Sequence, residues 1–142
     1  MYRVRDLLHG RETYSVQDHQ MVSEVANRMA AWHVGAILVM SEGSLGGVFS
    51  ERDLMVRVVL AGLDPAATPV SAVMSRNLAT VEDSAPVEVA MEVMHQHNCR
   101  HLPVLRGREV AGFLSMRDLM AFELSRKSEE LQQMRAYIQG SI

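Results

Sequence analysis

Apolar residues recur in two stretches of the chain with the spacing of an amphipathic helix. Positions i, i+3, i+4 and i+7 are apolar in both stretches, which are Val22, Val25, Ala26 and Met29, then Val87, Ala90, Met91 and Met94. This spacing gathers the apolar side chains on one helix face and predicts two helices that cover a core. Asp18, and Asp83 with Ser84, are candidate N-caps for these helices, and Pro86 suits a first helical turn.

Short apolar or β-branched runs flank each predicted helix and predict strands. The expected strands are Ser15-Val16, residues 36–40 and residues 45–49 in the first half, and Thr80-Val81, residues 102–105 and residues 110–114 in the second. Polar and glycine-containing turns separate the last two strands of each half. A second helix is expected to begin at Ser50 and at Ser115, the first of them ending near Gly62, a suitable C-cap. Each half is therefore predicted to be β–α–β–β–α.

The two halves are copies of one another at an offset of 65 residues. Residues 47–55, Gly-Val-Phe-Ser-Glu-Arg-Asp-Leu-Met, align without a gap on residues 112–120, Gly-Phe-Leu-Ser-Met-Arg-Asp-Leu-Met, and six of the nine positions agree. Matches such as Arg11 with Arg76 and Val16 with Val81 extend the alignment outside this block. The chain is interpreted as a tandem duplication with an α+β fold, in which two repeats pack about a pseudo-twofold axis.

This repeat divides the chain into three parts. Residues 1–64 are expected to form the first repeat with an N-terminal lead-in, and residues 65–125 the second repeat with its linker. The linker is Asp64–Pro69, and Val70–Met74 is predicted to be a short helical lead-in to the second copy. Residues 126–142 are expected to form a helical tail, because Leu131, Met134 and Ile138 fall on one helical face.

Composition narrows the class of protein. Of the 142 residues, 48% are hydrophobic and 22% charged, which is typical of a globular chain. The net charge of −3 makes nucleic acid and anionic membranes poor partners, since both bind basic surfaces. Cys99 is the only cysteine, which excludes an intrachain disulfide framework and favours a reducing compartment. The longest uninterrupted apolar run, Ala36–Met40, is far shorter than a membrane span of roughly 18 residues. With no signal peptide at the start, we expect a cytoplasmic protein.

The repeated block places Ser-x-Arg-Asp between a strand and a helix. One interpretation is a capping box, in which the Ser50 hydroxyl accepts from the Asp53 N–H and the carboxylate accepts from the Ser50 N–H. The other is a nucleotide site, because the N–H groups at a helix N-terminus suit phosphate. There the serine can donate to a phosphate oxygen, the aspartate can accept from two ribose hydroxyls, and the arginine can screen phosphate charge.

The two blocks, together with Arg100-His101-Leu102-Pro103-Val104, resemble the CBS domain, and their tandem arrangement resembles a CBS pair (Bateman module) over about residues 4–125. The tail from Leu131 to Gly140 is similar to that of stand-alone bacterial CBS-pair proteins. The resemblance implies a non-catalytic regulatory module without a metal or catalytic cofactor. Its ligands would be adenine nucleotides (AMP, ADP, ATP or NAD(H)) or S-adenosylmethionine, bound in clefts between the copies, and its signal would pass to an effector protein.

The family's composite sites, carried onto this sequence, give two clefts. One would use Ser15, Val34, Gly35 and Ala36 with Ser115, Arg117 and Asp118. The other would use Thr80, Cys99, Arg100 and His101 with Ser50, Arg52 and Asp53, and Arg100 would also reach the phosphates of the first. Because Gly35-Ala36 in one copy matches Arg100-His101 in the other, the clefts are expected to differ in charge and to differ in ligand or occupancy.

Other chemistry is weighed against this interpretation. His95, His97 and His101 do not share a helix face, so a zinc site is not expected. Ser50 and Ser115 lie outside any Gly-x-Ser-x-Gly elbow, so hydrolase chemistry is not expected either.

Two groups of side chains have a structural and a functional interpretation. The arginines near the start, Arg3, Arg5 and Arg11, could touch phosphate but are expected to be solvated. Four methionines at equivalent positions of the copies are expected to fill the core, with an adaptable interface as the alternative; they are Met29, Met55, Met94 and Met120.

The apolar stripe of the tail also predicts association. We expect a homodimer held partly by the tail helix, because the stripe is too long to leave in water. The alternative is a tail folded back on its own subunit. At the level of function, the alternative is a structural dimerisation or adaptor module that binds no ligand.

Overall fold

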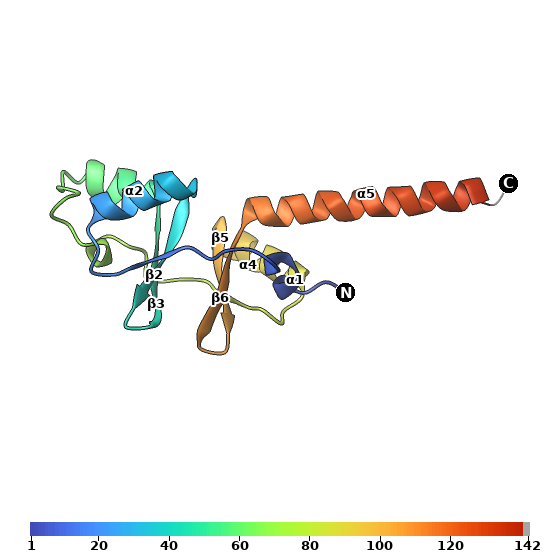
Figure 1. Ribbon diagram of the computed structural model, residues 1–142, viewed down its shortest axis with the longest axis horizontal. Coiled ribbons are helices and arrows are strands. Elements are labelled where there is room, and N and C mark those ends of the chain that lie inside the picture. The colour runs from blue at the N-terminus through green and yellow to red at the C-terminus, as the bar shows by residue number, and fades with distance from the viewer. Residues whose placement is uncertain (141–142) are drawn as a thin grey trace.

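The computed structural model describes residues 1–140 and contains two three-stranded sheets that lie side by side (Figure 1). The first half consists of β1 (Ser15–Gln17), α2 (Val22–Trp32), β2 (Ala36–Ser41), β3 (Ser44–Ser50) and α3 (Glu51–Asp53), which continues as the π-helical segment η1 (Leu54–Val59). The second half consists of β4 (Val81–Glu82), α4 (Val87–His97), β5 (His101–Arg106), β6 (Glu109–Ser115) and α5 (Met116–Gly140). Two short helices precede the halves, α1 (Val4–Leu8) and η2 (Val70–Ala72). The predicted β–α–β–β–α order and the α+β fold are confirmed in both copies.

Both sheets have the same topology. In the first, β1 runs parallel to β2, and β2 pairs antiparallel with β3. In the second, β4, β5 and β6 repeat this arrangement, including a register shift at the same place in the hairpin. The β2–β3 turn uses Glu42 and Gly43, both with positive φ (50° and 81°). Two successive residues of positive φ match the right-handed twist of the strands that they connect.

The helices begin later than the sequence pattern predicts. Their N-cap residues are Met21 and Pro86, not Asp18 and Asp83. The two aspartates bind the sheet instead: Asp18 accepts a hydrogen bond from Ser41 Oγ at 2.8 Å, and the buried Asp83 pairs with Arg106 at 2.9 Å. A cap is a local interaction, and here a longer-range partner satisfies the carboxylate.

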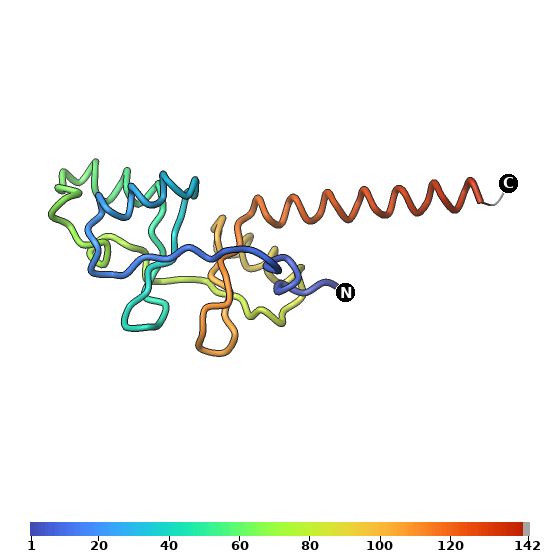
Figure 2. The backbone as a smooth tube through the Cα atoms, in the orientation of Figure 1, coloured from blue at the N-terminus to red at the C-terminus, as the bar shows by residue number. Residues whose placement is uncertain are grey.

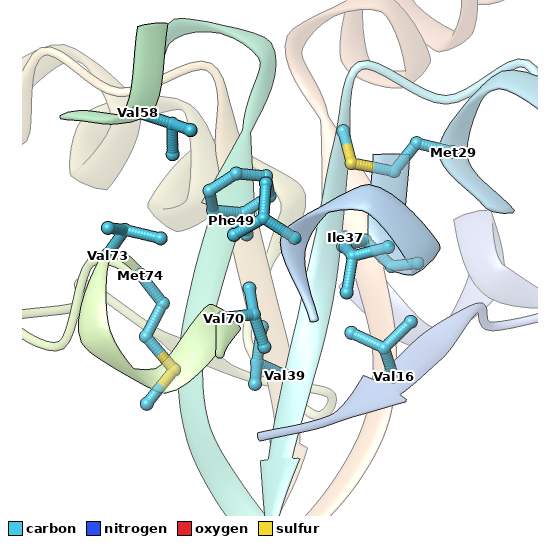
Figure 3. Close-up of a cluster of buried hydrophobic side chains, with 11 residues drawn as sticks. Val16, Met29, Ile37, Val39, Phe49, Val58, Val70, Val73 and Met74 are labelled. Atoms are coloured by element: carbon cyan, nitrogen blue, oxygen red, sulfur yellow. The ribbon is translucent and has the colours of Figure 1, made fainter. Parts of the chain in front are cut away.

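Each sheet is covered on one face by its own apolar core. Figure 3 shows the first core, in which Phe49, Ile37 and Met29 pack together with residues of η1 and η2. Met94 is buried in the second core, so two of the four equivalent methionines fill cores as predicted. The other two, Met55 and Met120, are 53% and 60% exposed, so the prediction of core filling is wrong for them.

The segments that lead into each copy pack on the other copy. Val70, Val73 and Met74, predicted to open the second repeat, are buried in the first core. Val4, in the lead-in assigned to the first repeat, is buried in the second core. Figure 2 shows the two connecting segments running in opposite directions between the copies. The predicted boundary at residue 64 follows the sequence repeat, whereas the packing exchanges the two lead-ins.

Helix α5 passes without a break through the predicted boundary between residues 125 and 126. Neither proline nor glycine occurs between Phe113 and Gln139, so nothing in the local sequence ends the helix. Arg126 ties the helix to α4 through Glu88 at 3.7 Å, and beyond this point α5 projects away from the body (Figure 1). The structure therefore does not fold the tail back on its own subunit. The last two residues of the predicted tail, 141–142, lie outside the described residues.

No helix within residues 1–140 is both long enough and apolar enough to cross a membrane.

Candidate functional site

A cleft of about 1550 Å³ opens between the two copies. Segment 11–14 and residues of α2 and β2 line it from one side, and β5, β6 and the start of α5 line it from the other. Eight of the residues predicted from the sequence line this cleft together: Val34, Gly35, Ala36, Arg100, His101, Ser115, Arg117 and Asp118. Most of the first predicted site is thus assembled in one place, with Arg100 and His101 added to it.

The remaining predicted residues lie elsewhere. Ser15 is exposed on β1 and is replaced at the cleft by its neighbour Tyr14. Thr80 is exposed just before β4, and Cys99 is half-buried against the second core, where burial raises the pKa of its thiol. The other predicted residues outside the cleft are Ser50, Arg52 and Asp53. The structure does not bring these six residues into the cleft that it forms.

The turn at the start of α5 is a capping box that faces the cleft. The Ser115 N–H donates to Asp118 Oδ2 at 2.8 Å, and the Asp118 N–H donates to Ser115 Oγ at 3.1 Å. The equivalent turn of the first copy has the same two bonds, at 3.0 Å and 3.1 Å between Ser50 and Asp53. The capping interpretation of the repeated motif is therefore confirmed in both copies. It leaves one carboxylate oxygen of each aspartate for another partner.

In the second copy that partner is Arg11, an arginine that the sequence analysis expected to be solvated. Its Nη2 lies 2.6 Å from Asp118 Oδ1, and both side chains line the cleft. Burial alone would raise the pKa of Asp118, but Arg11 and the hydrogen bonds from Ser115 outweigh burial and hold that pKa below its ordinary value. The only available signal was the alignment of Arg11 with Arg76, which does not name a partner.

In the first copy the equivalent aspartate, Asp53, has partners in η1 and in the segment that follows η2. Asp53 Oδ1 lies 3.6 Å from Arg57 Nε and 3.4 Å from Ser75 Oγ. Arg57 also donates to the carbonyl oxygens of Val73 and Met74, at 3.4 Å and 3.1 Å. These contacts tie η1 to the segment that follows η2. Asp53 of the first copy therefore takes part in a structural brace, away from the cleft.

The cleft carries both cations and anions on each wall. Arg11, Arg100 and Arg117 face it together with Glu12, Glu51 and Asp118. The ring of His101 stacks on Phe113 with 5.3 Å between centroids. Burial lowers the pKa of His101, Arg100 lowers it further, and Asp118 and Glu51 oppose this change. The imidazole is therefore neutral near pH 7, beside a permanently charged guanidinium.

The backbone at Gly35 lies close to Glu51 of the same copy. Its carbonyl accepts from the Glu51 N–H at 2.9 Å, and a methyl group on Gly35 would lie 3.4 Å from the Glu51 carboxyl carbon. At the equivalent position of the second copy, the backbone carbonyl oxygen of Arg100 accepts from the Met116 N–H at 2.7 Å. The first copy thus has Gly35 beside Glu51, whereas the second copy has Arg100 beside Met116. The two sides of the cleft are therefore chemically different.

The cleft can hold an organic anion with hydroxyl groups. Its carboxylates can accept hydrogen bonds from the hydroxyls, and its guanidinium groups can bind the anion. Val34, Ala36 and Phe113 offer apolar contact. Among residues 1–140, no group of three or more His, Cys, Asp or Glu is arranged to hold a metal ion.

Comparison with known proteins gives a consistent picture. The model of the CBS domain family matches residues 70–125. The CBS domain-containing protein YhcV of Bacillus subtilis is 34% identical over 114 residues, 80% of this chain and 81% of that protein. The mitochondrial CBS domain-containing protein CBSX3 of Arabidopsis thaliana is 32% identical over 84% of this chain, which spans 60% of that longer protein.

Solved structures agree with these sequence matches. A putative signal-transduction protein with CBS domains from Burkholderia ambifaria has a TM-score of 0.82 and 30% identity, covering 87% of this chain and 95% of its own. A CBS domain protein from Pyrobaculum aerophilum, complexed with AMP, has a TM-score of 0.75 and 34% identity, covering 82% and 89%. The duplicated sequence, the two matching sheets and these relatives together show that the chain belongs to the CBS domain family.

Proposed function

We propose that this chain is a regulatory module that binds an adenine nucleotide in the cleft beside Ser115 and Asp118. The observation that carries the proposal is the arrangement of the cleft, where Asp118 and the first turn of a 25-residue helix line one wall and Val34, Gly35 and Ala36 of the other copy line the opposite wall. The Pyrobaculum relative that was solved with AMP supports it. CBS domain proteins are typically regulatory rather than catalytic, and the proposal includes no reaction.

Three groups of cleft residues suit the three parts of a nucleotide, which are the ribose, the phosphate and the base. The Asp118 carboxylate suits the ribose hydroxyls, because an ionised carboxylate only accepts hydrogen bonds. The N-terminal turn of α5, with the Ser115 hydroxyl and the Arg117 guanidinium, suits phosphate, because the positive end of a helix dipole and guanidinium groups attract anions. Val34 and Ala36, which line the cleft from the first copy, suit the base. AMP, ADP, ATP and NAD(H) all contain these three parts.

The second predicted site, built from Thr80, Cys99, Arg100 and His101 with Ser50, Arg52 and Asp53, stays a prediction. The contacts of Asp53 with Arg57 and Ser75 weigh against it, because a ligand there would have to replace them.

We further propose that the module acts as a homodimer and passes its signal to an effector protein. The outer half of α5 carries large apolar side chains in water, with Leu131, Met134 and Tyr137 exposed by 53%, 61% and 79%. A second copy would cover this stripe. Because the nucleotide site lies at the start of the same helix, a movement of the first turn of α5 on ligand binding would also move the stripe.

Thermal unfolding with added nucleotides tests the function. A ligand that binds only the folded chain stabilises it, by about 2.7 kcal/mol at a concentration one hundred times its Kd. We expect AMP, ADP, ATP or NAD(H) at millimolar concentration to raise Tm, and GMP to raise it less. If none of the adenine nucleotides changes Tm, the alternative of a structural dimerisation module without ligand binding replaces the proposal.

A further inference from the structure

The ion pair between Arg11 and Asp118 links the two walls of the cleft. Arg11 lies on the segment that leads from α1 to β1, whereas Asp118 lies in the first turn of α5. The carboxylate side chain is 15% exposed and the arginine side chain 47% exposed. The guanidinium thus lies at the solvent side of the pair and the carboxylate at its inner side.

A nucleotide in this cleft would compete for the pair. Asp118 Oδ2 already accepts from the Ser115 N–H, so Oδ1 is the oxygen that a ribose hydroxyl would approach, and Oδ1 is the atom that Arg11 contacts. A guanidinium that gives up a carboxylate loses its anion, and a phosphate is the anion whose geometry fits its planar fork of donors.

We propose that Arg11 determines the ligand class of this cleft: when a nucleotide binds, Asp118 exchanges Arg11 for the ribose hydroxyls and Arg11 pairs with the phosphate. The exchange keeps both charged groups paired only if the ligand carries a phosphate. Adenosine would leave Arg11 without an anion, so the cleft selects a phosphorylated nucleotide over the nucleoside. This inference rests on the proposed function and adds a residue and a selectivity to it.

The first copy lacks the parts for this exchange. Arg76, which the repeat places at the position of Arg11, donates to the carbonyl oxygen of Ser71 at 2.7 Å. Asp53 contacts Arg57, whose guanidinium is also bound to backbone carbonyls. The exchange is therefore confined to the cleft at Asp118, and Arg76 provides a control within the same chain.

Titration calorimetry with AMP and adenosine tests the inference on the wild type, Arg11→Gln and Arg76→Gln. We expect the wild type to bind AMP at least about 10-fold more tightly than adenosine, since a hydrogen bond to a charged group corresponds to about 10- to 150-fold in affinity. Arg11→Gln should lose most of this ratio, because AMP loses the partner of its phosphate and adenosine no longer has to displace Arg11 from Asp118. Arg76→Gln should keep the wild-type ratio.

The outcomes separate this inference from the proposed function. If the wild type binds both ligands and Arg11→Gln keeps the wild-type ratio, the role of Arg11 is wrong and nucleotide binding stands. If the wild type binds neither ligand, the proposed function fails first. Arg11→Lys keeps the charge without the planar fork and should retain part of the ratio, and it replaces Arg11→Gln if that variant does not fold. If the ratio of AMP affinity to adenosine affinity in Arg11→Lys falls to the value of the neutral variant Arg11→Gln, the inference is also overturned.

Discussion

Two equivalent glycines, Gly47 on β3 and Gly112 on β6, allow the exchanged lead-in segments to be tested separately. Each lies where the connecting segment of the chain crosses its strand. A methyl group on Gly47 would lie 2.7 Å from the Ser75 carbonyl oxygen and 2.8 Å from Met74 Sδ. A methyl group on Gly112 would lie 2.7 Å from a terminal methyl of Leu8. The distances are the same, but the first neighbour is backbone and the second is the end of a side chain.

This difference sets the expected magnitudes for Gly47→Ala and Gly112→Ala. Val48 and Ser75 exchange two backbone hydrogen bonds, of 3.0 Å and 2.8 Å, so the crossing segment cannot move away without weakening them. Overpacking costs about 1–3 kcal/mol, and each weakened bond up to about 1 kcal/mol. We therefore expect Gly47→Ala to lower the free energy of unfolding by about 2–4 kcal/mol. Leu8 is only half-buried and can rotate, so Gly112→Ala should cost below about 1 kcal/mol.

Urea unfolding of the two variants at one fixed protein concentration measures both values, because association would otherwise add to the apparent stability. In thermal unfolding of a chain of this size, each kcal/mol lost from the free energy of unfolding should lower Tm by about 2–6 °C. Equal losses in the two variants, or a loss under about 0.5 kcal/mol for Gly47→Ala, would refute the reasoning that a fixed backbone crosses β3.

Three further predictions concern the site and the tail. Asp118→Ala should weaken AMP binding by about 10- to 150-fold in calorimetry, whereas Asp53→Ala should lower Tm and change AMP affinity by less than about twofold; the reverse order would place the nucleotide in the other copy. Because burial lowers the pKa of His101, the unfolded chain takes up that proton first, so stability should fall as pH drops through about 6.5. His101→Gln should remove this part of the slope in urea titrations between about pH 8 and pH 5.5, and an unchanged slope would contradict the assignment. Replacing Leu131 and Met134 by serine should raise the dissociation constant of the dimer in light scattering, and a variant with unchanged dissociation would show that α5 is not its interface.

The sequence by itself determined the duplication, the order of elements and the capping boxes. The duplication is visible when the chain is aligned with itself. The elements and the capping boxes depend on neighbours three or four residues apart, or on alternation along a strand, and such patterns are visible without coordinates. Ser115 and Asp118 were recognised in this way, and their bonds have the predicted donors and acceptors. The resemblance carried by the repeated block then placed most of the cleft.

Only the tertiary structure decided which partner each charged group has. Arg11 and Asp118 are more than one hundred residues apart, and they meet because the N-terminal lead-in crosses to the second copy before returning to the first. Arg11 and Arg76 are equivalent in sequence but have different partners, since a repeat specifies local conformation and not the surroundings that two fused copies create. Asp83 likewise forms an ion pair with Arg106 rather than a helix cap, because burial in the folded chain favours a charged partner over a backbone N–H.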